Sequence, residues 1–215
     1  MADFLGYLVQ RWDHLLGLTI EHAQVVLISL IIATAIGMLI GVLVYRNDGA
    51  TSAALNVTSV FVTIPSFALF GLLVPVMGIG AQPTIFALSM YALLPIVRNT
   101  TAGLRGVDPA VVESAEGMGM SARQRLLRIE MPLAWPVILS GIRVSALLIM
   151  GIAAIAAIVN GPGLGNDIFA GLSRVGTAQA LNLVLSATLG IVVLALIFDG
   201  LIALLGRITT PGGIK

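Results

Sequence analysis

The chain has 215 residues, of which 58% are hydrophobic and only 10% are charged, and its mean hydropathy is +1.06. Soluble domains carry about a quarter charged residues, so a membrane suits this composition better than water does. The net charge of +1 gives no general attraction to nucleic acid. The absence of cysteine excludes disulfides, thiolate metal sites and cysteine nucleophiles.

The first 17 residues carry apolar side chains at helical spacing and lack the basic start and cleavage site of a secretory signal. We expect a short amphipathic helix on the membrane surface, with Trp12 at the level of the lipid headgroups, acting as a structural brace. His14 and His22 are expected to be interfacial side chains rather than metal ligands or bases. No carboxylate-rich metal spacing surrounds them.

Five largely uncharged stretches follow, and a spanning helix needs about 20 apolar residues. The uncharged residues 49–97 are too many for one helix, and the turn-forming residues from Gly78 to Pro83 divide them in two. The sequence thus predicts one all-α membrane domain over residues 1–215. Its five spans lie near residues 23–45, 57–77, 84–104, 138–160 and 178–205.

Proline and glycine inside these spans predict how the helices bend and pack. Pro65, Pro75 and Pro95 remove backbone donors and favour kinks, which suit a translocation path but also occur in ordinary bundles. Gly37 and Gly41 form a pair of small residues that lets two helices approach closely.

Basic residues are unevenly distributed between the two sides of the five spans. Alternate flanks assign nine of the eleven Lys and Arg residues to one side and only Arg11 and Arg174 to the other. The basic-rich side of a membrane protein is cytoplasmic. This distribution predicts the amino terminus outside the cell and the carboxyl terminus inside.

Most of the charge lies in the loop 108–132, between the third and fourth spans. Asp108-Pro109 is typical of a helix start, and Gly117-Met118-Gly119 is expected to end that helix. Ser121 starts a second helix, with Gln124 three residues later as a capping box. Pro132 is expected to end it. Two short helices along the cytoplasmic face are therefore predicted.

Each of these short helices carries an apolar stripe that needs a cover. The stripes are Val111, Val112 and Ala115 on the first helix, and Leu126, Leu127 and Ile129 on the second. A partner protein or the membrane surface would provide one, whereas a solvated connecting loop is the alternative. Glu116 is expected to be solvated and to matter little.

The same loop resembles the EAA loop of the permeases of bacterial binding-protein-dependent ABC importers. The residues that match at the family's spacing are Glu113, Ser114, Ala115, Gly119, Ile129, Met131 and Pro132. Ser114 stands where alanine is usual and Met131 where leucine is usual, and both changes are small in volume. The resemblance implies a type I importer permease fold whose loop forms coupling helices that dock on an ATPase. Glu113, Ala115 and Gly119 would lie at or near that contact, with Gly119 permitting a sharp turn.

Further blocks resemble the osmoprotectant branch of these permeases, which imports glycine betaine, carnitine, choline and proline betaine. The blocks are Ile64–Leu69, Tyr91–Thr100, Gly117–Ser121, Gly141–Arg143 and Gly163–Gly165, and the similarity covers about residues 20–205. Because the binding protein usually sets specificity in this family, a permease for methionine or another small amino acid is the alternative.

The resemblance also implies the partners. The chain has no G-x-x-x-x-G-K-[ST] loop, so it is not expected to be an enzyme, and ATP and Mg²⁺ would be bound by separate ATPase subunits. No catalytic residue, metal site or cofactor is expected on this chain. A second permease, identical or related, and an extracytoplasmic solute-binding protein would complete the importer in the bacterial cytoplasmic membrane.

Two further sets of residues are candidates for transport itself. Pro65, Phe67, Tyr91 and Pro95 are candidates for the substrate path, although Phe67 and Tyr91 also suit ordinary packing. The segment 160–165 has too many turn residues to continue a helix. Its glycines are candidates for a periplasmic gate that meets the binding protein, and a simple connector is the alternative. These glycines are Gly161, Gly163 and Gly165.

A secondary transporter or channel is the alternative from another class of protein. Such proteins commonly place ionisable groups in mid-membrane, and the candidates here are Arg98, Arg143 and Asp199. We place Arg98 and Arg143 near the cytoplasmic ends of their spans. We expect Asp199 to form a structural ion pair with a neighbouring arginine rather than a proton relay. The sequence also shows no inverted second copy of the five spans.

Overall fold

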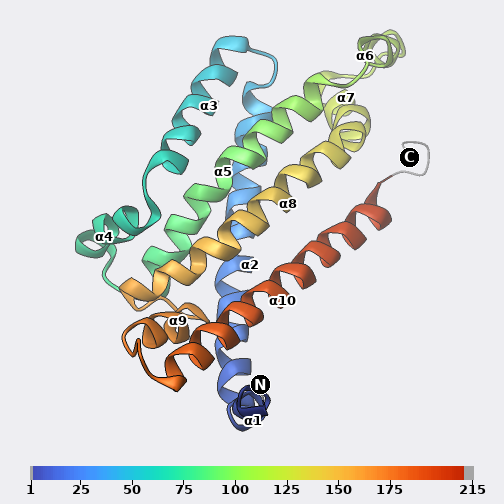
Figure 1. Ribbon diagram of the computed structural model, residues 1–215. Coiled ribbons are helices and arrows are strands. Elements are labelled where there is room, and N and C mark those ends of the chain that lie inside the picture. Colours follow the sequence, from blue (N-terminus) through green and yellow to red (C-terminus); the bar gives the residue numbers. More distant parts are fainter. Residues whose placement is uncertain (1, 211–215) are drawn as a thin grey trace.

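The computed structural model describes residues 2–210, and every regular element in that range is a helix (Figure 1). The α-helices are α1 (Ala2–Gln10), α2 (Trp12–Val44), α3 (Asp48–Thr63), α4 (Ser66–Met77), α5 (Ala81–Arg105), α6 (Pro109–Gly117), α7 (Ala122–Arg125), α8 (Met131–Ile155), α9 (Gly165–Leu172) and α10 (Ala178–Thr209). A π turn (Leu126–Glu130) joins α7 to α8, and a 3₁₀ turn (Ala156–Val159) follows α8.

The long helices run between two ends of the molecule (Figure 1). α6, α7 and the corner between α2 and α3 lie at one end, called the α6 end here, and α1, α4 and α9 lie at the other, the α9 end. Four helical stretches are long and apolar enough to cross a membrane: Trp12–Val44, Ala81–Arg105, Ala122–Val159 and Gln179–Thr209. The pair α3 and α4 makes a fifth crossing if it is counted as one broken span.

The predicted second span is not one straight helix. α3 and α4 meet at an angle of 94°, with Ile64 and Pro65 between them. Ile64 takes extended backbone angles, as residues before proline do, and Pro65 has no N–H to continue the helix. The predicted kink at Pro65 is therefore a complete break, whereas Pro75 and Pro95 lie inside α4 and α5.

The first span is longer than predicted. α2 begins at Trp12 and has 33 residues, so it is about 50 Å long, against a hydrocarbon layer of about 30 Å. The separate amino-terminal helix ends at Gln10 and does not continue to Gly17 as expected. Charged and polar residues such as Glu21 limit the uncharged run from which the span is predicted. They are compatible with a helix, so α2 begins before them.

α5 packs closely against α2 and α8. A Cβ atom at Gly37 would lie 2.7 Å from Ile96 Cγ2, and one at Gly41 would lie 2.6 Å from Thr100 Cβ. The close helix approach predicted for these two glycines is confirmed. α10 lies on the far side of α8 and leaves most of its apolar surface exposed (Figure 1).

Candidate functional site

α6 forms where the sequence predicts it. The Asp108 side chain accepts a hydrogen bond from Ala110 N at 2.9 Å, and Pro109 occupies the first helical position, where no N–H is needed. The helix ends at Gly117, and Gly119 follows at a φ of +82°. Because L side chains are strained at such an angle, the sharp turn implied for Gly119 is confirmed.

α7 starts with the predicted capping box. Ser121 N donates a hydrogen bond to Gln124 Oε1 at 2.8 Å, and Gln124 N donates to Ser121 Oγ at 3.4 Å. Both donors at the start of the helix are thereby satisfied without help from any other element.

Pro132 does not end the second helix, contrary to the prediction. The helical backbone continues through Ala122–Val159, so the loop passes directly into a spanning helix. A proline inside an α-helix clashes with the carbonyl group four residues earlier. Here the preceding turn is a wider π turn, in which Met131 N donates to Leu126 O, and the helix accommodates the ring.

An ion pair joins α6 to α7. Arg125 Nη1 lies 2.5 Å from Glu116 Oε2, and the Arg125 side chain is only 12% exposed. The Glu116 side chain is 67% exposed, as expected for a solvated carboxylate, but it also balances a largely buried guanidinium group. Glu113, on the same helix, is exposed.

The apolar stripes of the two short helices are covered only in part. Ala115 is buried, and Val112 and Leu126 pack against the core of the protein. Val111 and Leu127 stay 40% and 55% exposed. Met118, beside the turn, is 74% exposed. The loop therefore exposes three apolar side chains in addition to Glu113.

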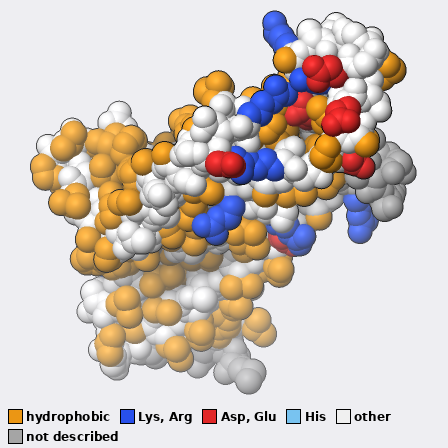
Figure 2. All heavy atoms as spheres, turned by 90° about the horizontal axis from the view of Figure 1, so that it is seen from above, with side chains coloured by type: hydrophobic (Ala, Val, Ile, Leu, Met, Phe, Trp, Pro, Cys, Tyr) orange, Lys and Arg blue, Asp and Glu red, His pale blue; other side chains and the backbone are white. Residues whose placement is uncertain are grey.

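Figure 2 views the molecule along its long helices, from the α6 end, and shows blue and red charged side chains gathered mainly over one side of that end. Hydrophobic side chains cover much of the remaining visible surface. The other matching residues of the loop differ in their exposure. Ser114 is exposed, while Ile129, Met131 and Pro132 are half-buried. The arrangement combines exposed charge with exposed apolar side chains, which suits docking on a protein better than contact with lipid hydrocarbon.

A buried carboxylate ties the base of the loop to the end of α2. Glu130 is 3% exposed, and its Oε2 accepts a hydrogen bond from the Tyr45 hydroxyl group at 2.6 Å. Arg46 Nη2 donates to Glu130 Oε1 at 3.0 Å, and Arg46 Nε donates to the Tyr45 hydroxyl oxygen at 2.6 Å. Burial, followed by the hydrogen bond to Glu130, raises the pKa of the Tyr45 phenol, which keeps it a donor.

Arg105, at the end of α5, extends this network. Its Nε donates to Tyr45 O at 2.6 Å, its Nη2 donates to Thr51 Oγ1 at 3.0 Å, and its Nη1 lies 2.8 Å from Asp48 Oδ1. Sequence reasoning missed Tyr45, Arg105 and Glu130 as a group. Tyr45 is 60 residues from Arg105 and 85 residues from Glu130 along the chain, and no local pattern connects them.

Three of the four candidate path residues lie at or beside the break between α3 and α4: Pro65, Phe67 and Tyr91. Tyr91 is 2% exposed and donates a hydrogen bond to Ile64 O at 2.6 Å, which satisfies a carbonyl group at the break beside Pro65. Phe67 is 57% exposed on α4. Pro95 lies inside α5, where its carbonyl oxygen accepts a hydrogen bond from Asn99. The geometry gives Tyr91 a structural role at the break.

The three candidate gate glycines are buried and tightly packed. A Cβ atom at Gly161 would lie 2.6 Å from Thr84 Oγ1, and one at Gly163 would lie 2.8 Å from His22 Nδ1. A side chain at Gly165 would clash with the Ala154 backbone. The segment is therefore held against α2, α5 and α8.

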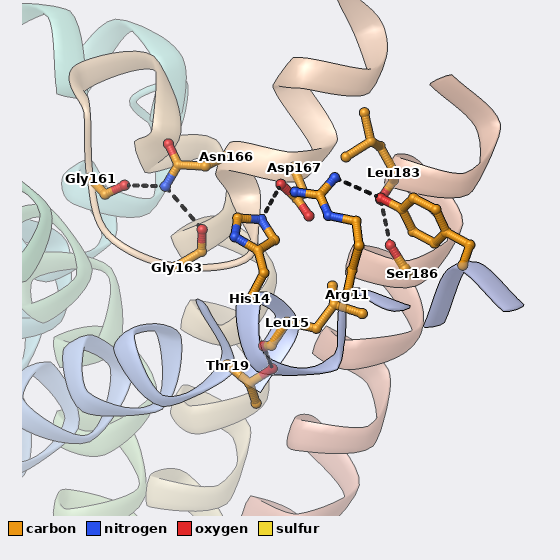
Figure 3. A network of polar contacts seen from close by, with 11 residues as sticks. Arg11, His14, Leu15, Thr19, Gly161, Gly163, Asn166, Asp167, Leu183 and Ser186 are labelled. Carbon is orange, nitrogen blue, oxygen red and sulfur yellow. Dashed lines mark hydrogen bonds and ion pairs between the residues drawn. The ribbon is translucent and has the colours of Figure 1, made fainter. Parts of the chain in front are cut away.

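Polar contacts fix the same segment from within and from α2. Figure 3 shows the Asn166 side chain between two carbonyl groups, donating to Gly161 O and Gly163 O at 3.0 Å each. The figure also shows His14 beside Asp167, with His14 Nε2 3.0 Å from Asp167 Oδ1.

The two histidines differ in their surroundings. His14 is partly exposed, whereas His22 is fully buried in the protein with its Nε2 3.1 Å from Met150 O. Within residues 2–210, no three His, Cys, Asp or Glu side chains are grouped so as to hold a metal ion.

Asp199 pairs with Arg143 across α8 and α10, which confirms the expected ion pair with a neighbouring arginine. Arg143 Nη2 donates to Asp199 Oδ2 at 2.5 Å, and Arg143 Nε donates to Asp199 Oδ1. Arg143 lies at the midpoint of α8. Residues 131–142 of α8 precede it and residues 144–155 follow it.

Comparison with known proteins identifies the family. Residues 33–210 match the family described as binding-protein-dependent transport system inner membrane component. The chain belongs to this family. It is therefore a permease subunit and a multi-pass membrane protein, and this family implies ATPase and binding-protein partners.

Similar permeases match along almost their whole length. An osmoprotectant import permease of Salmonella typhimurium is 36% identical over 99% of this chain and 100% of its own. A choline transport system permease of Bacillus subtilis is 33% identical over 100% of this chain and 97% of its own. A carnitine transport permease of Listeria monocytogenes is 36% identical, with the same coverage of both chains.

Solved importers share the fold of this permease. The MetNI methionine ABC transporter, in an inward-facing conformation, gives a TM-score of 0.72 at 23% identity, covering 91% of this chain and 94% of that one. An amino acid ABC transporter crystallised with histidines gives 0.74 at 19% identity, covering 95% and 97%. The all-helical importer permease fold predicted from the sequence is confirmed.

Proposed function

We propose that this permease imports an osmoprotectant, such as glycine betaine, carnitine, choline or proline betaine, as part of an ATP-driven ABC importer. The observation that carries the proposal is the similarity of the entire chain to permeases named for osmoprotectants, choline and carnitine. The solved methionine and amino acid importers, at 23% and 19% identity, support the fold and leave methionine or another small amino acid as the alternative solute.

The loop 108–132 is the element that would transmit the ATPase stroke to the membrane helices. A coupling element must be stiff, and the Asp108 cap, the Ser121 capping box and the Glu116–Arg125 ion pair all support stiffness. It must also bind its partner, and the exposed apolar side chains of the loop, together with the exposed Glu113, suit that purpose. Ala115, which is 1% exposed, would support the loop from inside rather than touch the ATPase.

The loop is also connected directly to the membrane helices. α7, the π turn and α8 form one continuous helical backbone, so a displacement of the loop would move α8 as well. Glu130 links the same π turn to the end of α2 through Tyr45 and Arg46. A push on the loop would therefore reach two spanning helices.

The partners follow from the family and from what one chain can supply. ATP and Mg²⁺ would be bound by separate ATPase subunits, and this permease would bind no cofactor of its own and hydrolyse no ATP. A second permease, identical or related, would complete the path, because five crossings are too few to enclose one. A solute-binding protein would deliver the solute at the α9 end, where the segment with Gly161, Gly163 and Gly165 forms the proposed gate.

The α6 end would face the cytoplasm. Arg46, Arg105 and the arginines of the loop 108–132 lie at this end, whereas Arg11 and Arg174 lie at the α9 end. The positive-inside distribution therefore supports an amino terminus outside the cell and a carboxyl terminus inside. A secondary transporter or channel would not need the coupling loop that the EAA residues form.

Uptake measurements test the proposal directly. Cells with and without the gene would be grown at high salt, and the uptake of radiolabelled glycine betaine, choline, carnitine and methionine would be compared. We expect gene-dependent uptake of at least one of the first three solutes and no gene-dependent uptake of methionine. Gene-dependent uptake of methionine alone would replace the proposed solute class with the alternative.

A further inference from the structure

The Arg143–Asp199 ion pair lies well inside two spanning helices, away from the ends of both. Arg143 has 12 residues of α8 on either side of it. Asp199 lies ten residues before Thr209, the last residue of α10, which places it about 15 Å inside that helix. Two hydrogen bonds hold the pair in a side-on arrangement, with both Nε and Nη2 of the guanidinium group donating to the carboxylate.

The pair is partly exposed on an otherwise apolar face. The Arg143 side chain is 48% exposed and that of Asp199 is 26% exposed. Their neighbours Val144, Val192 and Leu196 are apolar and 51%, 50% and 67% exposed. Charged groups facing lipid hydrocarbon are costly, and intramembrane charges almost always face a bundle interior or a water-filled cavity. This face of α8 and α10 therefore belongs to the inside of the assembled importer.

Two hollows beside the pair give a small solute access to both charges. One, of about 490 Å³, is lined by Ser140, Arg143, Asp199 and apolar residues of α8 and α10, and its volume falls within the usual range of ligand pockets, about 300–1,000 Å³. The other, of about 210 Å³, is lined in part by Ser140 and Arg143. Ser140 thus lies where the two hollows meet the guanidinium group.

We propose that Arg143 and Asp199 form a charge-recognition point for a zwitterionic solute on the translocation path, a proposal that rests on the proposed import function. The solute's carboxylate would replace Asp199 on the guanidinium group, and its cationic nitrogen would take the place of the guanidinium group beside Asp199. The planar fork of arginine suits a carboxylate because it can donate two parallel hydrogen bonds.

The exchange favours a solute that brings both charges together. The resting pair has no net charge, and a zwitterion leaves each group paired again after the exchange. A purely cationic solute such as choline would pair with Asp199 but leave Arg143 without an anion in a poorly solvated place. We therefore expect this point to matter more for glycine betaine and carnitine than for choline.

Charge-neutralising variants test the recognition point in the complete importer. Arg143→Gln and Asp199→Asn are each expected to lower glycine betaine uptake roughly tenfold or more, and choline uptake by less. Arg207→Gln is the matched control, since Arg207 is an exposed arginine in the last turn of α10, away from the pair. It is expected to transport both solutes like the unaltered permease.

A double variant separates recognition from folding. Arg143→Met/Asp199→Leu removes both charges and leaves neither unpaired, and such apolar replacements of ion pairs are often neutral for stability. It is expected to co-purify with the ATPase in normal yield and to lose glycine betaine uptake. Normal uptake of glycine betaine by this variant would overturn the proposal and leave the pair with a structural role only.

Thiol labelling provides a readout that does not depend on uptake. The natural chain has no cysteine, so Ser140→Cys introduces a single thiol beside the pair. We expect a water-soluble thiol reagent to label it in the purified importer, and glycine betaine during turnover to slow the labelling more than choline does. An unlabelled thiol, or equal slowing by both solutes, contradicts the proposal. If the unaltered importer transports none of these solutes, the proposed function fails instead.

Discussion

At the scale of single residues, a lack of space does not explain why position 119 is a glycine. A Cβ atom at this position would have nothing within 4 Å, so a larger side chain would fit in the available space. The constraint is the backbone, whose φ of +82° suits glycine and strains every β-branched residue. Gly117, two residues earlier, also has open space around it but lies at the end of α6 with an ordinary φ.

Gly119→Val is expected to distort the turn and abolish uptake. The local strain is about 1–3 kcal/mol, enough to shift the turn without unfolding the spanning helices. Gly117→Val is the matched control, because it adds the same side chain at a position without a positive φ, and we expect it to retain most uptake. Both chains would be assayed for uptake and for co-purification with the ATPase. Equal activity of the two would show that the turn geometry is not needed.

Glu113 and Glu116 lie on the same short helix but face different surroundings. Glu113→Lys is expected to weaken ATPase co-purification and uptake while leaving the thermal stability of the isolated permease unchanged, because the exposed carboxylate is part of the proposed docking contact. Glu116→Ala is expected to lower that stability by about 1–3 kcal/mol, because it leaves the largely buried Arg125 without its partner. Thermal unfolding in detergent, together with co-purification, distinguishes the two. An unchanged stability of Glu116→Ala would show that the ion pair with Arg125 does not stabilise the loop.

At the scale of elements, the Glu130 network joins the coupling loop to α2. Tyr45→Phe removes one of the hydrogen bonds to a carboxylate that is 3% exposed, and it is expected to lower stability by about 1–3 kcal/mol. Asp48→Asn, in the ion pair that Arg105 makes at the same corner, is the control. The Asp48 side chain is 95% exposed, so its loss is expected to cost about 1 kcal/mol or less. If Tyr45→Phe unfolds at the temperature of the unaltered chain, the network does not stabilise this junction.

Local signals made the short helices predictable. The Asp108 cap, the Ser121–Gln124 capping box and the turn at Gly119 each depend on residues within a few positions of one another. The link between Tyr45 and Glu130 joins positions 85 residues apart, and only the packing of α2 against the α5–α8 region brings them together. Sequence periodicity contains no information about such a pair.

The limits of the spanning helices were predictable only roughly. Uncharged runs predict which residues can lie in lipid, but they do not predict where a helix begins. α2 begins at Trp12, before Glu21 and His22, because neither of these residues breaks a helix. The opposite error occurs at Pro65, where an uncharged run contains a break of 94° between α3 and α4. At this break, the Ile64 carbonyl accepts a hydrogen bond from Tyr91, which is 27 residues away and which no local sequence signal connects to it.

At the scale of the whole molecule, the path of the chain fixes which loops share a side of the membrane. α2, α5 and α10 run from the α9 end to the α6 end, while α8 and the broken pair α3–α4 run in the opposite direction (Figure 1). Five crossings place the amino-terminal α1 and the end of α10 on opposite sides. Together with the positive-inside distribution, this path supports the proposal that the α6 end faces the cytoplasm.

Single cysteines test this orientation without a background signal, because the chain has none of its own. Gln82 and Ser173 are exposed at the α9 end, and Ser121 is exposed at the α6 end. An impermeant thiol reagent added to intact cells should label Gln82→Cys and Ser173→Cys but should label Ser121→Cys only after the membrane is permeabilised. All three side chains are exposed, so a missing signal reflects the side of the membrane rather than burial. Labelling of Ser121→Cys in intact cells, with protection of the other two, would invert the molecule and place the coupling loop outside, where no ATPase could drive it.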